Sequence, residues 1–258
     1  MDFLTVILSV WKRENLERQL EAIYNGTLLP DRVIIYQNEF HIDVSSIVKK
    51  YNGERIISFD HNHRYHARFA IPLFCESKYF SIFDDDTIPG LKWHEYAVSQ
   101  AESLGGIIGA NGRSFLANIN KQIATGGVSS GQFPEKAIYS DIVGHAWLAK
   151  KQHFHNMWSR KPFSIDTGED MHLSIVNKVF YGVDTYVPAQ PKDNPDVWGD
   201  CEPVLGGDTV ASWRSSDHTR NRLNLYKKWL EAGWCPYYRF NQKLGRVTFN
   251  NWNKTKSL

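Results

Sequence analysis

Three adjacent carboxylates, Asp84, Asp85 and Asp86, follow the apolar stretch of residues 79–83 directly. Neighbouring negative charges at the end of a buried strand repel one another unless a cation neutralises them. Mg²⁺ or Mn²⁺ binds carboxylate oxygens and leaves coordination positions for the oxygens of a diphosphate. The alternative is an acidic turn whose carboxylates cap the next helix in water. The strand that precedes the run favours the metal site.

A second acidic pair, Glu169 and Asp170, precedes Met171, Leu173 and Val176 at helical spacing. These apolar residues predict a helix that is anchored in the core and carries both acids in its first turn. A carboxylate held rigidly at a helix start can act as a general base for a substrate hydroxyl within hydrogen-bond reach. Helix capping alone explains the pair equally well from the local sequence.

Four β-rich apolar runs alternate with helical patterns over the first 90 residues. This order predicts an α/β fold with a mostly parallel sheet flanked by helices. Ligands of such sheets bind beyond the carboxyl ends of the strands, so we expect residues 11–13, 37–38 and 84–86 to converge there. The predicted strands are residues 4–10, 32–36, 55–59 and 79–83, and the predicted helices are residues 14–24, 42–51 and 66–75, with Pro72 distorting the last.

The remainder of the chain is less regular. Residues 105–134 are rich in Gly, Ser and Asn, which predicts short strands and loops, and residues 182–207 form a long Pro-, Asp- and Gly-containing segment that we expect to be a mobile lid. A further helix is expected over residues 217–232. Because neither an internal repeat nor a linker interrupts the chain, we predict a single domain over residues 1–258.

Charge and cysteine content exclude several classes of protein. The chain has 30 basic and 28 acidic side chains and a net charge of +2, too little for a general nucleic-acid or membrane-surface binder. Cys75, Cys201 and Cys235 show no CxxC spacing, so neither a disulfide framework nor a zinc knuckle is indicated. Residues 3–11 are too few for a spanning helix and lack signal-peptide features. We therefore expect a cytoplasmic or soluble intracellular protein without a membrane anchor.

Four stretches of the sequence resemble the GT-A glycosyltransferases. The likeness is greatest to the exostosin-like family 64 enzymes, is weaker to family 2, and covers most of the chain. The resemblance implies a Rossmann-like GT-A fold with a nucleotide-sugar-binding half over residues 1–90 and an acceptor-binding, catalytic half over residues 91–258, which includes a smaller acceptor-side subregion. The stretches are TVILSVWKRENL (residues 5–16), VIIYQNE (residues 33–39), NHRYHARF (residues 62–69) and FDDDT (residues 83–87).

The resemblance also implies roles for individual residues. Asp84 and Asp85 would contact the ribose and base side of the donor, and Asp86 would hold the Mn²⁺ or Mg²⁺ that bridges its diphosphate. Arg68 stands 16 residues before Asp84, which is similar to the family's placement of a donor-contacting arginine. The other residues implied in donor binding are Ser9, Trp11, Arg13, Gln37 and Asn38.

Positive charge is needed where the nucleoside diphosphate departs. Arg13 and Arg68 are candidates, and residues 212–222 (SWRSSDHTRNR) resemble the family's C-terminal Trp-His-Arg region. There Arg214 would contact the donor, and His218 would be a metal or phosphate ligand or simply a helix-start residue.

The stereochemical outcome depends on the second acidic pair. The Gly-Glu-Asp sequence at Asp170 is closer to the family 2 base motif than to the Asp-Asp of the exostosin-like enzymes. We predict inversion with Asp170 as the base and Glu169 beside it, whereas the exostosin-like resemblance implies retention.

The sequence therefore predicts a metal-dependent transferase that moves a sugar from a UDP-sugar to a hydroxyl of a carbohydrate or glycoprotein glycan. UDP-xylose and UDP-N-acetylhexosamine are candidate donors. A nucleotidyltransferase is disfavoured because residues 9–16 lack the glycine of a phosphate-binding loop. A non-catalytic carbohydrate-binding protein would need neither acidic cluster.

Overall fold

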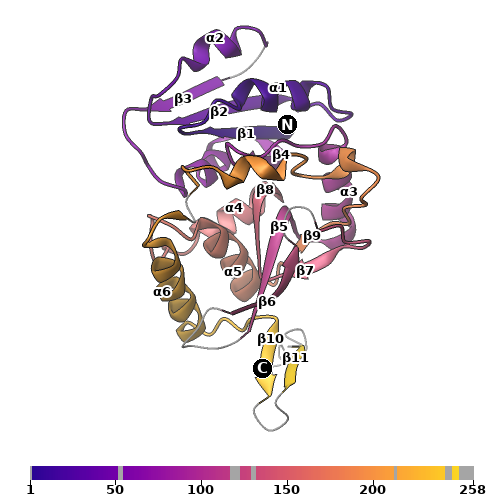
Figure 1. The fold of residues 1–258 in the computed structure, drawn as a ribbon, viewed down its shortest axis with the longest axis vertical. Coiled ribbons are helices and arrows are strands. Elements are labelled where there is room, and N and C mark those ends of the chain that lie inside the picture. Colours follow the sequence, from indigo (N-terminus) through magenta and orange to yellow (C-terminus); the bar gives the residue numbers. More distant parts are fainter. Residues whose placement is uncertain are drawn as a thin grey trace.

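The computed structural model describes residues 2–51, 55–116, 123–128, 132–211, 214–241 and 246–249. The described strands form one 11-stranded mixed sheet, in which the main path runs β11-β10-β5-β8-β4-β1-β2-β3. The α/β class predicted from the sequence is confirmed. Figure 1 shows helices on both sides of this sheet and a β10–β11 hairpin that extends from one end.

The first 90 residues supply the parallel part of the sheet. Strand β1 (Asp2–Val10) pairs in parallel with both β2 (Arg32–Asn38) and β4 (Ser77–Phe83), and β2 pairs in parallel with β3 (Arg55–Phe59). The connections carry helices α1 (Leu16–Tyr24) and α2 (Val44–Val48). The helix predicted over residues 66–75 is wrong, because two short 3₁₀ turns, η1 (Ala67–Phe69) and η2 (Ile71–Phe74), replace it. Pro72 lies in the second turn, and a proline can neither donate the backbone hydrogen bond of an α-helix nor fit into its interior.

The rest of the chain adds mainly antiparallel strands, which the mostly parallel prediction did not anticipate. Strand β8 (Ile142–Lys150) pairs antiparallel with both β4 and β5 (Ile107–Leu116). The remaining strands are β6 (Ile123–Val128), β7 (Ile138–Ser140), β9 (Thr185–Val187), β10 (Tyr238–Asn241) and β11 (Arg246–Phe249), and the helices are α3 (Trp93–Leu104), α4 (Lys151–Trp158), α5 (Glu169–Tyr181), α6 (His218–Glu231) and the 3₁₀ turns η3 (Pro195–Val197) and η4 (Pro203–Gly207).

Both faces of the sheet are buried at β1, β2 and β4. In β1, Leu4, Val6 and Leu8 point into one apolar cluster, while Ile7 points into another on the opposite face, as the two-residue period of a strand requires. Each fully buried side chain of this size contributes about 1.5–3 kcal/mol. Strand β1 is therefore held firmly in the sheet. No described helix is long and apolar enough to cross a bilayer.

Candidate functional site

A cavity of about 520 Å³ lies at the carboxyl ends of β1, β2 and β4, where the three polar loops were predicted to meet. We call it the aspartate cavity because Asp84, Asp85 and Asp86 line it. Residues of the second half of the chain complete it, including His145, Glu169 and Gly206. The site is thus shared between both halves of the chain.

Four residues around this cavity have a left-handed backbone, although none of them is glycine. They are Lys12, Glu39, Arg64 and His145, with φ between 61° and 74°. A non-glycine residue in this region costs about 1–3 kcal/mol and persists only where its surroundings hold it. Such strain gathers at functional sites, so its concentration in the loops around one cavity supports a functional role for that cavity.

His145 reaches the aspartates because of a bulge in β8. Two residues of β8, His145 and Ala146, lie opposite one residue of β5, Ala110. The bulge turns the His145 backbone to φ 68°, and its carbonyl accepts a 2.9 Å hydrogen bond from the amide of Asp84. Bulges commonly re-aim a side chain beside an active site, and this one brings an imidazole to the aspartate run.

Asp84, Asp86 and His145 form a possible metal-binding cluster, in which one ligand atom from each lies within 4.8 Å of the others. Burial raises the pKa of Asp85 to about 7, and burial together with the charge of Asp84 raises the pKa of Asp86. Oδ2 of Asp85 is buried and has no hydrogen-bond partner among the described residues. Crowded, desolvated carboxylates beside an imidazole fit a divalent cation, which would relieve their repulsion.

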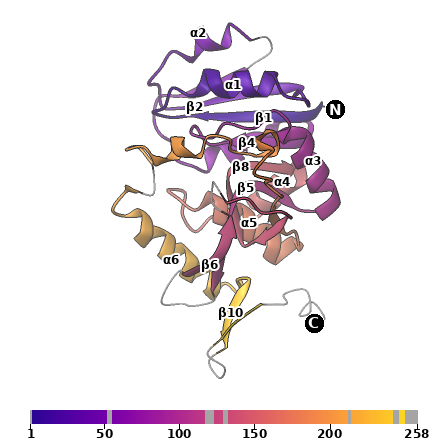
Figure 2. The same cartoon turned by 45° about the vertical axis from the view of Figure 1, so that its right-hand side comes forward.

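Arg13, at the end of β1, connects the aspartates to residues 202–211, which we call the strap. Its guanidinium lies 2.5 Å from Asp85 and 3.2 Å from Asp86, and it donates two hydrogen bonds of 2.7 and 2.8 Å to Asp208. Burial lowers the pKa of Arg13, but these carboxylates outweigh burial and raise it. In Figures 1 and 2 the orange strap runs beside the β1 and β4 end of the sheet.

Arg68 is buried between the two acidic clusters. It lies 2.7 Å from Asp84, 3.4 Å from Glu169 and 3.2 Å from the hydroxyl of Ser9, and it stacks over the ring of Trp147 at 5.1 Å. Burial lowers the pKa of Arg68, whereas the nearby carboxylates raise it overall. The arginine therefore stays charged and joins the aspartate run to the start of α5.

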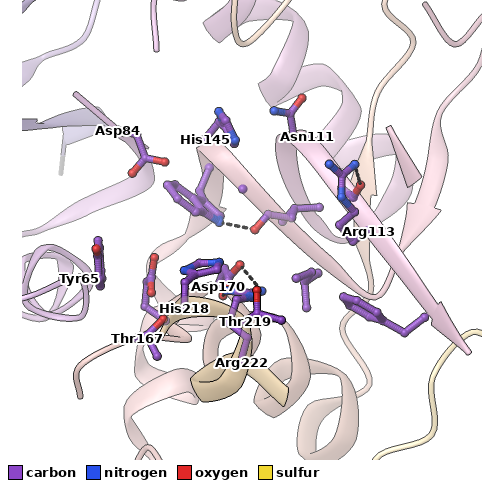
Figure 3. Close-up of a pocket in the computed structure, with 17 residues that line it drawn as sticks. Tyr65, Asp84, Asn111, Arg113, His145, Thr167, Asp170, His218, Thr219 and Arg222 are labelled. Atoms are coloured by element: carbon purple, nitrogen blue, oxygen red, sulfur yellow. Dashed lines mark hydrogen bonds and ion pairs between the residues drawn. The ribbon is translucent and has the colours of Figure 1, made fainter. Parts of the chain in front are cut away.

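A second cavity, of about 460 Å³, adjoins the first and shares Asp84, His145 and Glu169 with it. We call it the Arg222 cavity, and Figure 3 shows it. At its base, Arg222 of α6 forms a two-fold ion pair with Asp170, with both N–O distances at 3.0 Å. The aspartate and Arg222 cavities together could hold two reactants side by side, with the second acidic pair between them.

The two acids of this pair have different environments. Burial and the neighbouring charge of Asp170 raise the pKa of Glu169 to about 7. Burial also raises the pKa of Asp170, but the charge and hydrogen bonds of Arg222 outweigh it, so the pKa of Asp170 is lowered. Asp170 therefore has the lower pKa of the two acids and is ionised at neutral pH, whereas Glu169 has the higher pKa.

The remaining residues predicted to bind the donor do not all face the aspartate cavity. Trp11 and Asn38 line it. The Trp11 indole donates to Glu39 at 3.1 Å, and the Asn38 amide is bonded to Tyr36, Asn62, His63 and Arg64, which makes Asn38 an organiser of the cavity wall.

Three predicted residues lie elsewhere. Gln37 is buried and donates to the carbonyl of Ile42, outside both cavities. Arg214 is exposed and donates to the carbonyl of Gly207 in the strap. His218, the other predicted metal ligand, begins α6 and lines the Arg222 cavity. The possible metal-binding cluster contains His145 beside Asp86 and does not include His218.

Sequence reasoning did not single out His145, Asp208 or Arg222. Arg222 lay within the segment of interest, residues 212–222, and its spacing of four from His218 could have indicated that both share one helix face. His145 and Asp208 carry no local signal, because a bulge and a long-range ion pair bring them to the site.

The parallel strands with carboxylates at their ends, continued by antiparallel strands, define the Rossmann-like α/β fold of glycosyltransferases. Structural comparison agrees. The chain is similar to S. aureus TarS, with a TM-score of 0.53 and 12% identity over 72% of this chain and 36% of TarS. It is also similar to residues 1–349 of S. aureus TarS in complex with UDP-GlcNAc, with a TM-score of 0.53 and 12% identity over 75% of this chain and 60% of that one.

The chain thus spans between about a third and three fifths of the TarS chains that it matches. No protein-family profile matches this chain, and no curated protein matches it in sequence. At 12% identity the likeness establishes the fold.

Proposed function

We propose that this protein is a metal-dependent glycosyltransferase that moves a sugar from a nucleoside diphosphate sugar to a hydroxyl of a glycan. The observation that carries the proposal is the Asp84, Asp86 and His145 cluster in a strand-end cavity whose neighbouring cavity contains Glu169 and Asp170. The likeness to a TarS structure that contains UDP-GlcNAc supports a UDP-sugar donor. We therefore take UDP-N-acetylhexosamine as the first candidate donor and UDP-xylose as the second.

On the donor side, we propose that residues 1–90 supply most of the nucleotide contacts, within a single domain of residues 1–258. Asp84, Asp86 and His145 would hold the metal, and a mixed carboxylate and imidazole set suits Mn²⁺ better than Mg²⁺. When bound, the ion would add positive charge beside the departing diphosphate. Arg13 and Arg68 line the same cavity, and their fixed charges would stabilise the charge that develops there.

On the acceptor side, we propose that Asp170 removes the proton from the attacking hydroxyl. The acceptor oxygen bonds to the anomeric carbon as the bond to UDP breaks, the proton passes to Asp170, and the anomeric configuration inverts. Asp170 suits the role because it lines the Arg222 cavity and its lowered pKa keeps it ionised. A retaining transferase of the exostosin-like type would use the same donor site, and the anomeric configuration of the product, measured by NMR, separates the two.

The test is UDP release from UDP-GlcNAc and UDP-xylose by the purified chain, with and without EDTA and added Mn²⁺. We expect Mn²⁺-dependent turnover that Asp86→Ala and Asp170→Ala abolish and that the exposed Asp193→Ala retains. Turnover unaffected by EDTA would contradict the metal assignment. Sugar binding without any turnover, in the presence of Mn²⁺ and a panel of glycans, would identify a carbohydrate-binding protein instead.

A further inference from the structure

Three carboxylates from two separate segments share the guanidinium of Arg13. Asp85 lies 2.5 Å from it, and Asp208 of the strap accepts two hydrogen bonds of 2.7 and 2.8 Å. The contact with Asp86 is the longest of these, at 3.2 Å. An arginine is always charged in a protein, and its five N–H donors form a fixed fork. Arg13 is therefore a permanent cation that two carboxylates hold closely and the third holds less closely.

Asp86 is the carboxylate for which Arg13 and a metal ion would compete. Its Oδ2 is the atom that contacts Arg13, and the same side chain belongs to the possible metal-binding cluster with Asp84 and His145. The Arg13 and Asp86 side chains are 10% and 12% exposed, so water screens their charges little. A guanidinium at this place reduces the repulsion among the aspartates, but it also repels a divalent cation.

Asp208 gives Arg13 a partner that does not depend on Asp86. Oδ1 of Asp208 also accepts a 3.2 Å hydrogen bond from the amide of Val210, which fixes this carboxylate within the strap. The Asp208 side chain is 37% exposed, so its charge can be removed without leaving a cavity in the core. A second ion pair, between Glu202 and Arg18, joins the strap to α1. The strap thus supplies one carboxylate that contacts Arg13 and another that pairs with a different arginine.

We propose that Arg13 is the resident counter-cation of Asp86, which a divalent cation displaces when it binds, and that Asp208 is a positioning residue that retains the displaced guanidinium. The proposal rests on the proposed function, because it takes Asp86 as a metal ligand. Arg13 lines the aspartate cavity, so a guanidinium held by Asp85 and Asp208 would remain beside the diphosphate of the donor. Metal binding would thereby release Arg13 for contact with the donor.

The test is electron paramagnetic resonance titration of the full chain with Mn²⁺ alone, without nucleotide. A solution at pH 8 keeps Asp85 mainly ionised, since burial raises its pKa to about 7. Arg13→Gln should bind Mn²⁺ about tenfold more tightly than the unchanged protein, the effect of one charge-assisted hydrogen bond. Asp208→Asn should bind Mn²⁺ about threefold more weakly, the effect of one partly exposed ion pair, because Arg13 is then left to the aspartates. Asp208→Glu should restore most of the affinity.

A double-mutant cycle separates this route from a direct effect of the Asp208 charge on the ion. In the Arg13→Gln background, Asp208→Asn should no longer weaken Mn²⁺ binding, because no guanidinium remains for Asp208 to hold. Glu202→Gln, which removes the strap carboxylate that pairs with Arg18, should leave the affinity unchanged. Far-ultraviolet circular dichroism establishes that each variant is folded.

An Mn²⁺ affinity that does not rise in Arg13→Gln would overturn the competition for Asp86. Equal weakening by Asp208→Asn in both backgrounds would overturn the role of Asp208. Asp86→Ala separates this inference from the proposed function. If Asp86→Ala abolishes Mn²⁺ binding but Arg13→Gln and Asp208→Asn leave the affinity unchanged, the metal assignment stands and this inference is rejected. If Asp86→Ala leaves Mn²⁺ binding unchanged, both are rejected.

Discussion

At the residue scale, the imidazole of His145 would serve the proposed metal site better than a third carboxylate. A further negative charge beside Asp84 and Asp86 would increase the repulsion that already raises the pKa of Asp86. A neutral imidazole supplies a ligand without that charge and shifts the preference of the site toward a transition metal. The strained backbone of His145 is therefore consistent with a conformation held for ligand placement.

Replacing the two histidines separately tests this assignment. Loss of a group that only supports a metal ligand weakens metal binding by roughly 10- to 100-fold. His145→Ala would remove a direct ligand, so we expect it to weaken Mn²⁺ binding by at least this factor. His218→Ala should change Mn²⁺ affinity little, since His218 is not part of the cluster of Asp84, Asp86 and His145. Electron paramagnetic resonance titration of Mn²⁺ measures both variants. A larger loss in His218→Ala would instead support the ligand that the sequence predicted.

The pair of Asp170 and Arg222 makes a prediction about pH. Arg222 stabilises the charged form of Asp170, so the lowered pKa of Asp170 keeps the proposed base ionised into acidic solution. In Arg222→Gln that stabilisation is lost, and the pKa of Asp170 rises under the remaining effects of burial and Glu169. The acidic limb of kcat/KM against pH, at saturating Mn²⁺, should therefore move to higher pH.

Arg220→Gln is the control for this change, since Arg220 is exposed and pairs with Asp217. Its profile should coincide with that of the unchanged protein. An acidic limb that stays in place in Arg222→Gln, with far-ultraviolet circular dichroism showing a folded chain, would mean that another group sets it. Glu169 and His218, which also face Asp170, would then be the residues to replace.

At the element scale, the strap packs closely against Asp86 of the possible metal-binding cluster. A Cβ at Gly206 would lie 3.2 Å from Oδ2 of Asp86, whereas a Cβ at Gly207 would have no atom within 4 Å. Arg13 contacts the same oxygen of Asp86 at 3.2 Å and so restrains the carboxylate. A side chain at Gly206 would therefore press on the Asp86 carboxylate. Gly207, where a side chain would meet no atom, provides a matched control.

Gly206→Ala should displace the Asp86 carboxylate by a few tenths of an ångström and weaken Mn²⁺ and donor binding. A misplacement of 1 Å can cost about 100-fold at a catalytic site, so a loss of about three- to tenfold is expected here. Gly207→Ala should leave both affinities unchanged. Calorimetric titration with Mn²⁺ and UDP measures the two variants, and equal effects of both changes would show that the strap does not position Asp86.

The elements differ in how far the sequence alone could predict them. Strand β4 was predictable because its apolar residues end at an abrupt run of carboxylates, and this local pattern also located two of the three residues of the possible metal-binding cluster. The pairing of β8 with β4 and β5 was not predictable, because its antiparallel register joins residues between 29 and 71 positions apart. The bulge at His145 arises from that pairing, so the third residue of the cluster was missed for the same reason.

At the scale of the whole molecule, the aspartate cavity draws residues from both the parallel and the antiparallel parts of one continuous sheet. Asp84 and Arg68 come from the first 90 residues, whereas His145, Glu169 and Gly206 come from the remainder. A ligand in this cavity contacts both halves of the chain at once. Binding of such a ligand should therefore stabilise the folded protein against unfolding.

We accordingly expect UDP-GlcNAc and Mn²⁺ together to raise the melting temperature of the chain. At a donor concentration 100-fold above Kd the native state gains about 2.7 kcal/mol. A domain of this size gains roughly 2–4 °C per kcal/mol, so the rise should be about 5–10 °C. Without ligands, Asp86→Ala should melt at about the same temperature as the unchanged protein, because the change removes a crowded carboxylate. With both ligands present, the variant should lose most of the rise in melting temperature. Differential scanning fluorimetry measures both, and an equal rise in Asp86→Ala would place the donor or the metal elsewhere.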